Sequence, residues 1–239
     1  SDVLIETLYN QGSISTDDVK ANFSPEANEC FIFKGTSSSA LARFDAKSKR
    51  IYRIEKKSAY GIKPRNAEQT FSLNMLMDPE IKLVALTGKA GTGKTLLALA
   101  TAIEQNRLYE QILLARPIVA LSNRDIGYLP GDASEKISPY MQPLFDNLAV
   151  IKHSFNPRSN EYQLIEDMVK EERLNITPLA FIRGRSLSNA FFIIDEAQNL
   201  TPHEIKTIIT RAGEGTKMVF TGDLQQIDSP YLDMKSNGL

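Results

Sequence analysis

The chain has 239 residues, of which 42% are hydrophobic and 24% charged, and its formal net charge is −1 at pH 7. A chain of this length and composition can bury a sizeable core, and it lacks the overall charge excess that is typical of proteins bound to nucleic acid or to membrane surfaces. The charge is nevertheless uneven, because residues 34–65 carry ten basic side chains and only two acidic ones.

The single cysteine, Cys30, rules out an intrachain disulfide and fits a reducing compartment. Apolar runs in the sequence stay well short of the roughly 18 residues that a membrane-spanning helix needs. We therefore expect a cytoplasmic protein without membrane contact. The chain begins with Ser1 and Asp2 and shows no basic-then-apolar leader, which favours a fragment or a processed form.

Residues 1–62 are predicted to form a linker or small appendage that is mainly β. The stretch "VLIETL" favours a short helix, and "CFIFKG", "ALARFD" and "IYRIEK" favour three short strands. The polar tetrapeptide "AKSK" joins the last two strands, and Gly61 and Pro64 mark the exit from this region.

The pattern changes in residues 63–239. Four continuous apolar runs, "IKLVALTG", "QILLARP", "FFIIDE" and "TKMVFTGD", favour buried strands, and "KTLLALATAIEQ" has helical spacing. Continuous apolar strands separated by helices are typical of a parallel sheet that is covered on both faces. We therefore predict an α/β core with a mostly parallel sheet.

Two further helices are predicted between Pro117 and Ile176. The first, "DASEKISPYMQPLFDNL", would begin at Asp132 as its N-cap, and Pro139 and Pro143 would bend or interrupt it. The second is "NEYQLIEDMVKEERL".

A glycine-rich stretch, "GKAGTGKT", lies between the first apolar run and the first helical run, and it fits the pattern G-x-x-x-x-G-K-[ST] of a P-loop. In such a loop, backbone N–H groups and the positive end of the helix hold the phosphates. Lys94 would reach the β- and γ-phosphates, and Thr95 would offer its hydroxyl to Mg²⁺. The alternative is a glycine-rich turn without a ligand. The predicted ATP-binding residues here are Gly88, Lys89, Ala90, Gly91, Thr92, Gly93, Lys94 and Thr95.

Two adjacent carboxylates, Asp195 and Glu196, follow the buried run "FFII". A P-loop needs an acidic group at a neighbouring strand end, which is where open α/β sheets bind ligands. We assign Asp195 to Mg²⁺, through water, and Glu196 to the role of general base or water-orienting group for attack on the γ-phosphate. The alternative for Glu196 is a solvated helix cap.

The run "VFTGDLQQ" places polar residues at a third strand end. A side chain there can contact the γ-phosphate, and Gln226 is the candidate, with Asp223 holding the loop or a water. The pattern G-D-x-x-Q is weak alone, but it is specific downstream of a P-loop and an acidic strand end.

Gln69 lies in "KPRNAEQ", ahead of a short amphipathic helix in "TFSLNMLMD". A glutamine side chain both donates and accepts, as bidentate recognition of the N6/N7 edge of adenine requires. We expect Gln69 to read adenine, and the alternative is an exposed glutamine on a helix. Because the sequence lacks the N-K-x-D pattern for guanine, ATP is expected rather than GTP.

These motifs together resemble the PhoH family of ATPases, through "GIKPRNAEQTF", the P-loop stretch, "ARPIV", "IGYLPGD" and the run from "PLAFIRGR" to "GDLQQID". The resemblance covers residues 61–239 and implies a RecA-like P-loop NTPase core that acts as an ATP-driven RNA helicase. In longer members a PIN-type nuclease domain precedes the ATPase, and "ALARFD" resembles their linker. Residues 1–60 contain no recognisable PIN acidic cluster, so we expect the nuclease to lie outside this chain. The family pattern also continues past Leu239, which implies a C-terminal truncation.

The motif order is similar to that of superfamily 1 helicases, in which two RecA-like cores meet at one ATP, whereas this sequence carries one P-loop and one acidic strand end. An arginine from a neighbouring copy would then stabilise the transferred phosphoryl group. A repeating head-to-tail contact closes into a ring, and the resemblance implies a hexamer. The candidate arginines are Arg183, Arg185 and Arg211, and the alternative for each is a surface arginine in a loop.

Contacts with single-stranded RNA are expected in "ARPIVALSNRDIGYLP", which offers phosphate donors and a stacking surface. The candidates are Arg116, Ser122, Asn123, Arg124 and Tyr128. The basic segment 34–65, with Tyr52 and Tyr60, would extend this track, and the alternative is a solvated charged face.

Two functions remain open from the sequence. One is a Mg²⁺-dependent ATPase that translocates on RNA as a ring, and the other is a nucleotide-gated module that binds RNA and oligomerises with little turnover. The motifs "DEAQ" and "GDLQQ" argue against a third, a P-loop kinase. His153 and His203 lack neighbours at ligand spacing, so a zinc site is not expected. His203 lies instead in a capping box that Thr201 begins and Glu204 completes.

Overall fold

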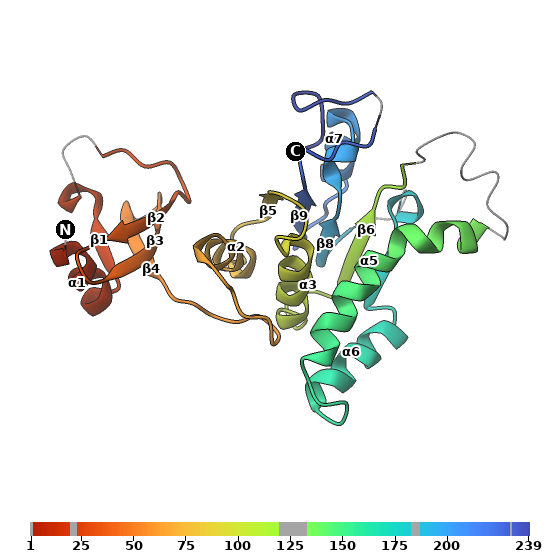
Figure 1. Ribbon diagram of the computed structural model, residues 1–239, viewed down its shortest axis with the longest axis horizontal. Coiled ribbons are helices and arrows are strands. Elements are labelled where there is room, and N and C mark those ends of the chain that lie inside the picture. The colour runs from red at the N-terminus through yellow and green to blue at the C-terminus, as the bar shows by residue number, and fades with distance from the viewer. Residues whose placement is uncertain (1, 20–22, 120–132, 183–186, 230) are drawn as a thin grey trace. The chain divides into compact units, whose positions relative to one another are not determined.

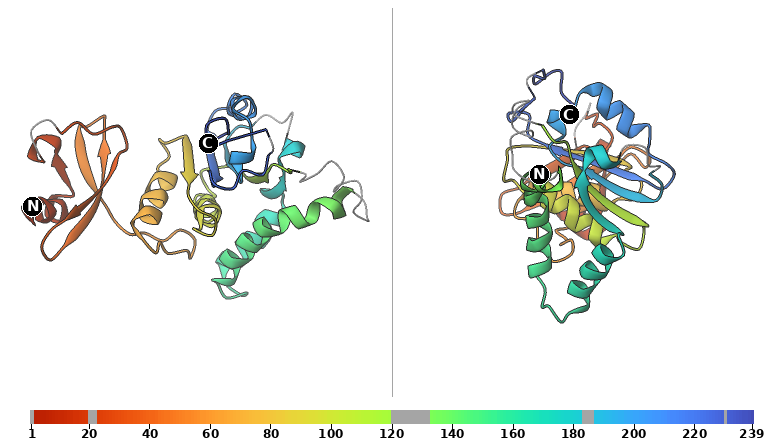
Figure 2. Two further views of the ribbon diagram at one scale, coloured as in Figure 1. Left: turned by 45° about the horizontal axis from the view of Figure 1, so that its top comes forward. Right: turned by 90° about the vertical axis from the view of Figure 1, so that its right-hand side faces the viewer.

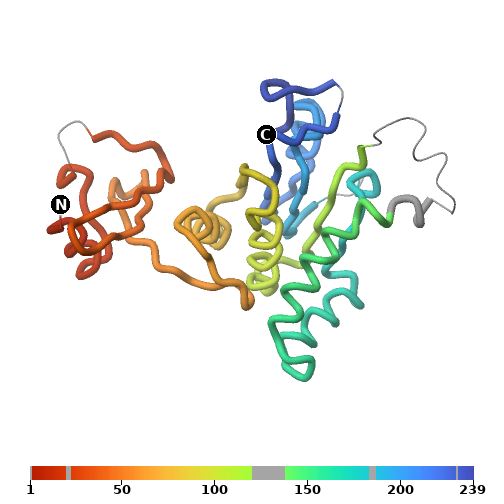
Figure 3. The backbone as a smooth tube through the Cα atoms, viewed as in Figure 1, coloured from red at the N-terminus to blue at the C-terminus, as the bar shows by residue number. Residues whose placement is uncertain are grey.

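The computed structural model describes residues 2–19, 23–119, 133–182, 187–229 and 231–239 (Figure 3). The chain divides into two compact units (Figure 1). One comprises Ser1–Ser58 and Lys63–Asn74, and the other Ala59–Ile62 and Met75–Leu239. The predicted boundary between residues 62 and 63 falls within this interleaved stretch and stays a prediction. Across the described ranges, none of the helices combines the length and apolarity that crossing a bilayer would need.

The first unit is built on a four-stranded antiparallel sheet in the order β1-β4-β3-β2. Ile5 and Leu8 of the N-terminal helix pack on one face of this sheet, against Ile14, Phe44 and Ile51. The three expected strands are therefore present, and a short fourth strand joins them. The elements of this unit are α1 (Asp2–Gln11), β1 (Ser13–Ser15), η1 (Thr16–Asp18), β2 (Cys30–Lys34), β3 (Ser39–Asp45), β4 (Arg50–Ile54) and the beginning of α2 (Ala67–Met77).

The second unit contains a five-stranded sheet in the order β5-β9-β8-β6-β7, and every neighbouring pair is parallel. The α/β fold with a parallel sheet is thus confirmed. Its strands are β5 (Leu83–Thr87), β6 (Gln111–Arg116), β7 (Leu174–Pro178), β8 (Ala190–Ile194) and β9 (Lys217–Gly222). Its helices are α3 (Lys94–Glu104), α5 (Ala133–His153), α6 (Asn160–Lys170) and α7 (Pro202–Ile209), with the short 3-10 helices η2 (Leu179–Ile182) and η3 (Ala197–Asn199).

The inner strands of this sheet are covered on both faces, as their continuous apolar sequences predict. Every residue of β8 and β9 is buried, and Ile205 and Ile208 of α7 pack on the cluster around Phe192 and Ile194. The strand β5 differs, because it lies at the edge of the sheet and alternates between exposed and buried residues. Its apolar side chain Leu83 is 52% exposed, so the run "LVALT" is covered on one face only.

The section between β6 and β7 folds into α5 and α6, which lie side by side as an antiparallel pair (Figure 1, Figure 2). Of the two expected effects of Pro139 and Pro143, a bend or an interruption, the interruption was wrong, because α5 continues past both prolines to His153. The predicted N-cap Asp132 lies outside the described residues. The second helix ends at Lys170 rather than Leu174, because Leu174 begins β7. This short edge strand was not predicted from the sequence.

The turn into α7 follows its predicted sequence signature. The hydroxyl of Thr201 accepts from the N–H of Glu204, and the Glu204 carboxylate accepts from the N–H of Thr201, with Pro202 in the first turn. The capping box around His203 is therefore confirmed.

Because all five strands are parallel, their carboxyl ends meet at one edge of the sheet. Gly88–Thr95 follows β5, Asp195 follows β8 and Asp223 follows β9, while Arg116 is the last residue of β6. The P-loop, the two acidic strand ends and Arg116 therefore lie at the same edge, where open parallel sheets bind their ligands.

Residues 59–62 fold as a tight turn of the second unit, in which the backbone groups of Ala59 and Ile62 exchange two hydrogen bonds of 2.9 Å. Tyr60 is 9% exposed; its ring meets Phe155 edge-on, and its hydroxyl donates to the carbonyl of Glu161 at 2.8 Å. Burial, together with the nearby carboxylates of Glu161 and Glu104, raises the pKa of Tyr60 to about 12.

We expect Tyr60→Phe to lower the free energy of unfolding by about 1 kcal/mol near neutral pH, because it removes one buried hydrogen bond. The pKa of Tyr60 lies above the ordinary value of 10.0, so the neutral phenol stabilises the fold fully below pH 10 and loses this contribution as the pH rises toward 12. Urea unfolding at several pH values should therefore show wild type losing its advantage in that window. Tyr231→Phe, at a side chain that is 91% exposed, is the control, and a difference that stays constant with pH would contradict the assignment.

Candidate active site

The glycine-rich loop connects β5 to α3 and encloses the ammonium group of Lys94. Gly91 and Gly93 have φ angles of 74° and 81°, which residues other than glycine rarely adopt. These two conformations let the backbone turn around a small space. The Nζ of Lys94 donates to the carbonyls of Gly88 at 2.6 Å and Lys89 at 2.8 Å. The loop thus has the strand–loop–helix context that a phosphate cradle requires.

The carboxylate of Asp195 lies directly beside the first turn of α3. Its Oδ1 accepts from the hydroxyl of Thr95 at 2.5 Å and from the hydroxyl of Thr221, on β9, at 2.6 Å. Asp195 is only 3% exposed, so these donors compensate for its lost hydration. Three strand or helix ends therefore converge on one carboxylate oxygen.

The residues at this point fit a magnesium ion. The Thr95 hydroxyl and the Asp195 carboxylate are the hard oxygen donors that Mg²⁺ prefers, and their 2.5 Å contact places them close enough to serve one ion with the help of water and substrate phosphates. A bound Mg²⁺ would neutralise charge on the β- and γ-phosphates.

Arg116 occupies the other side of the same carboxylate. Its Nε and Nη2 donate to Oδ2 of Asp195 at 2.9 and 2.5 Å, and its Nη2 lies 3.8 Å from Oε1 of Glu196. Its Nη1 donates to the carbonyl of Tyr140 on α5 at 3.1 Å. The structure thus places Arg116 against the acid pair, where it offsets their mutual repulsion, while its expected contact with RNA stays a prediction.

Glu196 adopts an unusual backbone conformation. Its φ and ψ angles are 53° and 40°, a left-handed conformation that costs a non-glycine residue of the order of 1 kcal/mol. It stands at the N-cap position of η3, but its side chain makes no capping hydrogen bond. Its Oε2 instead accepts from Nε2 of Gln198 at 2.5 Å. The carboxylate is 35% exposed and lines the cavity next to the P-loop.

Asp223 links the end of β9 to the P-loop. Its Oδ2 accepts from the backbone N–H of Ala90 at 2.9 Å, and its Oδ1 accepts from the N–H of Gln225 at 2.9 Å. Gln226 lines the same cavity. The two residues that the pattern G-D-x-x-Q singles out therefore lie beside the phosphate loop, as their assigned positions require.

The cavity formed by these strand ends has a volume of about 340 Å³, which is within the range of small-ligand sites. The predicted site residues that line it are Ala90, Gly91, Gly93, Lys94, Thr95, Arg116, Asp195, Glu196, Asp223 and Gln226. The structure thus brings most of the predicted nucleotide site into one space, although the role of each residue stays a prediction.

Other predicted residues lie elsewhere. Gln69 belongs to the first unit, where its Oε1 accepts from the N–H of Arg65 at 2.7 Å and its own N–H donates to Asn66; its reading of adenine stays a prediction. Six candidates lie outside the described residues, namely Arg183, Arg185, Ser122, Asn123, Arg124 and Tyr128.

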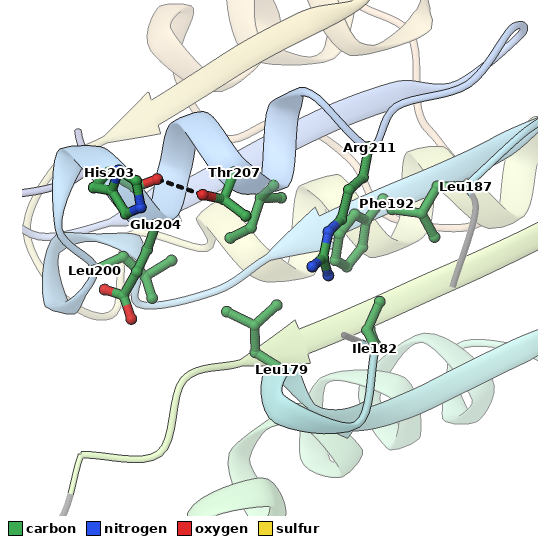
Figure 4. Close-up of a pocket in the computed structure, with 10 residues that line it drawn as sticks. Leu179, Ile182, Leu187, Phe192, Leu200, His203, Glu204, Thr207 and Arg211 are labelled. Carbon is green, nitrogen blue, oxygen red and sulfur yellow. Dashed lines mark hydrogen bonds between the residues drawn. The ribbon is translucent and has the colours of Figure 1, made fainter. Parts of the chain in front are cut away.

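Arg211 lies on a second cavity of about 300 Å³ (Figure 4). Its apolar lining comes from Leu179, Ile182, Leu187, Phe192, Leu200 and Ile208, and α7 adds the polar side chains of His203, Glu204 and Thr207. In the close-up the side chain of Arg211 points toward the space between α7 and η2 (Figure 4). Arg211 does not line the cavity around the P-loop of its own chain, so its expected action would require a neighbouring copy.

Sequence reasoning assigned no individual role to Thr221, Gln198 and Asn147. Thr221 donates to Asp195, Gln198 bonds to Glu196, and Asn147 of α5 lines the cavity. The available signal for Thr221 and Gln198 was their position inside "FTGD" and "DEAQ", whereas Asn147 lies on a helix that carries no motif.

Comparisons with known proteins agree with the fold and the motifs. Residues 61–239 match the family described as PhoH-like protein. "Protein PhoH2" of Bacillus subtilis is 44% identical over 248 aligned positions, covering 100% of this chain and 54% of that protein. "Protein PhoH2" of Mycolicibacterium smegmatis is 35% identical, covering 94% of this chain and 50% of that protein. A "PhoH-like protein" of Synechocystis is 42% identical over 60% of this chain. The chain spans about half the length of the PhoH2 relatives that it matches.

Because the ion pair of Arg116 with Asp195 is buried, breaking it should reduce stability more than breaking an exposed ion pair does. Arg116→Gln leaves the buried carboxylate without its guanidinium, and we expect a loss of about 3 kcal/mol, near the lower end for a broken buried pair because two hydroxyls still donate. Arg173→Gln, which breaks an exposed pair with Glu171, should cost at most about 1 kcal/mol. Urea unfolding measures both losses, and equal values would contradict a buried role for Arg116.

Proposed function

This chain belongs to the PhoH-like protein family, and on that premise we propose that it binds ATP with Mg²⁺ and hydrolyses it as the motor part of a longer RNA-processing protein. The observation that carries the proposal is the contact between the Thr95 hydroxyl and the Asp195 carboxylate, 2.5 Å long. It joins the P-loop helix to the acidic strand end, which is the pairing that a metal–triphosphate complex needs.

The assigned roles follow from the positions of the side chains. Backbone N–H groups of the P-loop and the ammonium of Lys94 would hold the phosphates, after Lys94 exchanges its loop carbonyls for phosphate oxygens. Thr95 and Asp195 would hold Mg²⁺, which supplies charge neutralisation when bound. Glu196, with its carboxylate partly exposed to the cavity, would orient and deprotonate the attacking water. Gln226 would contact the γ-phosphate and report its hydrolysis, and Asp223 would hold the loop or a water.

The assembly belongs to the proposal as well. Because the described residues provide one P-loop and one acidic strand end, a neighbouring copy would supply an arginine to the transferred phosphoryl group, and Arg211, Arg183 or Arg185 is the candidate. A contact of this head-to-tail kind closes into a ring, for which we propose a hexamer. RNA would run along the segment that begins at Arg116, and a PIN nuclease domain elsewhere in the full-length protein would use the motion. A cytoplasmic location goes with this role.

A second candidate is a nucleotide-gated module that binds RNA and oligomerises with little turnover. The observation that favours it is the engagement of Asp195 by Arg116, because a charge-compensated acid pair can hold a nucleotide-dependent conformation without rapid hydrolysis. Turnover measurements separate the two candidates.

We expect phosphate release from ATP to need Mg²⁺ and to rise when single-stranded RNA is added. Glu196→Gln should lower this release by about 10²-fold or more, because it removes the proposed base, and it should leave nucleotide affinity nearly unchanged. Lys94→Ala is the comparison, because it should weaken the binding of a fluorescent ATP analogue instead. RNA retention that depends on nucleotide without any turnover would favour the second candidate.

If the protein forms a ring, we expect the mass of the assembly in solution to change when nucleotide is added. Light scattering should give a mass near six times the 26.7 kDa of one chain when ATP is present with Glu196→Gln, which slows its consumption. Arg211→Ala should abolish turnover while retaining nucleotide binding if this arginine acts on the neighbouring site. A protein that stays monomeric with ATP at concentrations well above those of the turnover assay would argue against the ring.

A further inference from the structure

Gln198 has a fully buried side-chain amide, and the proposed function assigns no role to it. It lies in η3, two residues after Glu196, and its exposed fraction is 0%. A buried carboxamide costs free energy unless its donor and acceptor sides both find partners. The partners of Gln198 are therefore informative about its role.

Each side of this carboxamide bonds to a different part of the site. Its Nε2 donates to Oε2 of Glu196 at 2.5 Å and to the backbone carbonyl of Gln226 at 2.9 Å. Its Oε1 accepts from the backbone N–H of Asp223 at 3.2 Å. One side chain thus holds the proposed base and both ends of the loop 223–226.

The loop that Gln198 grips is itself attached to the phosphate cradle, because the Asp223 carboxylate accepts from the N–H of Ala90 at 2.9 Å. Gly222 makes room for this arrangement, since a Cβ built on it would lie 2.3 Å from Oε1 of Gln198. A continuous chain of hydrogen bonds therefore runs from the P-loop backbone through Asp223 and Gln198 to Glu196.

The chemistry of the partners requires an amide at this position. Glu196 and the Gln226 carbonyl are acceptors, whereas the Asp223 N–H is a donor, so a side chain with one donor end and one acceptor end satisfies all three. A carboxylate would face Glu196 with a like charge, and an apolar side chain would leave buried polar groups unpaired. The left-handed backbone of Glu196 also needs such a restraint, because unconstrained residues leave that conformation.

We propose that Gln198 is the positioning residue of Glu196, fixing its carboxylate toward the nucleotide and coupling it to the loop 223–226. A displacement of that loop when the γ-phosphate leaves would then move Glu196 with it. This inference deepens the proposed ATPase function and rests on it, while the hydrogen-bonded link between Gln198 and Glu196 can be tested without activity.

The first experiment compares Gln198→Met with wild type. Methionine keeps the length of the side chain and adds no charge, but it removes the donor and the acceptor. We expect kcat for ATP to fall about 10²-fold, as for loss of an aligned base, with KM and nucleotide affinity changed by less than about threefold, since the interaction matters in the transition state. A role in packing alone would leave kcat near wild type in the folded variant, and that result would overturn the proposal.

A matched control uses an exposed glutamine whose amide also donates to a carboxylate. Nε2 of Gln142 donates to the Asp146 carboxylate at 2.9 Å on the surface of α5. Gln142→Met should leave kcat and KM unchanged, because solvent replaces this hydrogen bond.

The second experiment exchanges donor and acceptor between the two residues. Gln198→Glu alone should be strongly destabilised, because two carboxylates then meet in a buried place. Adding Glu196→Gln restores one donor opposite one acceptor, so the exchanged pair should unfold at a higher urea concentration than the sum of the two single changes predicts. Its ATPase activity should stay low, because the base is gone.

The two experiments separate the failure of this inference from the failure of the proposed function. If wild type releases no phosphate under any condition, the ATPase proposal fails, and the exchanged pair still reports on the link. If the exchanged pair is only as stable as the single changes predict, the link itself is refuted. Should Gln198→Met fail to fold, the exchanged pair still decides whether the link between Gln198 and Glu196 exists, and without that link the proposal fails.

Discussion

The carboxylate of Asp195 is the point on which the architecture of this site depends. It receives hydroxyl donors from Thr95 on α3 and Thr221 on β9, and a guanidinium from Arg116 on β6. A carboxylate that is 3% exposed has to be compensated by such donors, because desolvation of an unpaired charge costs several kcal/mol. Four separate elements are therefore held in register by the requirement to satisfy one buried group.

The same interaction shapes the electrostatics of the cavity. Arg116 brings one positive charge to two adjacent acids, so these three side chains together carry a net charge of −1. A triphosphate would bring several further negative charges to this edge, and Lys94 alone would leave much of that charge unbalanced. This imbalance is the physical reason for proposing a divalent cation between Thr95 and Asp195. The side chain of the second acid, Glu196, is 35% exposed, so water can reach it.

Sequence reasoning succeeds here where structure is local. The P-loop, the capping box at Thr201 and the apolar strands each follow from a short stretch of residues, and parallel strands bring their ends together once the fold class is known. It falls short where contacts span the chain. Arg116 and Asp195 are 79 residues apart in the sequence, so local patterns cannot predict their pairing. The role of Gln198 likewise depends on Asp223, which the fold places beside it at the end of β9. The strand β7 also goes unnoticed, because its five residues lack a continuous apolar run.

The position of β5 at the rim of its sheet has a practical consequence. Among the described residues β9 is the one strand that pairs with β5, so its other edge makes no strand pairing there, and its side chain Leu83 is 52% exposed. Sheet rims of this kind can recruit a strand from any nearby polypeptide. Self-association through this edge would increase with protein concentration and would not depend on nucleotide. Leu83→Lys would reduce it, so such self-association is easy to distinguish in purified samples.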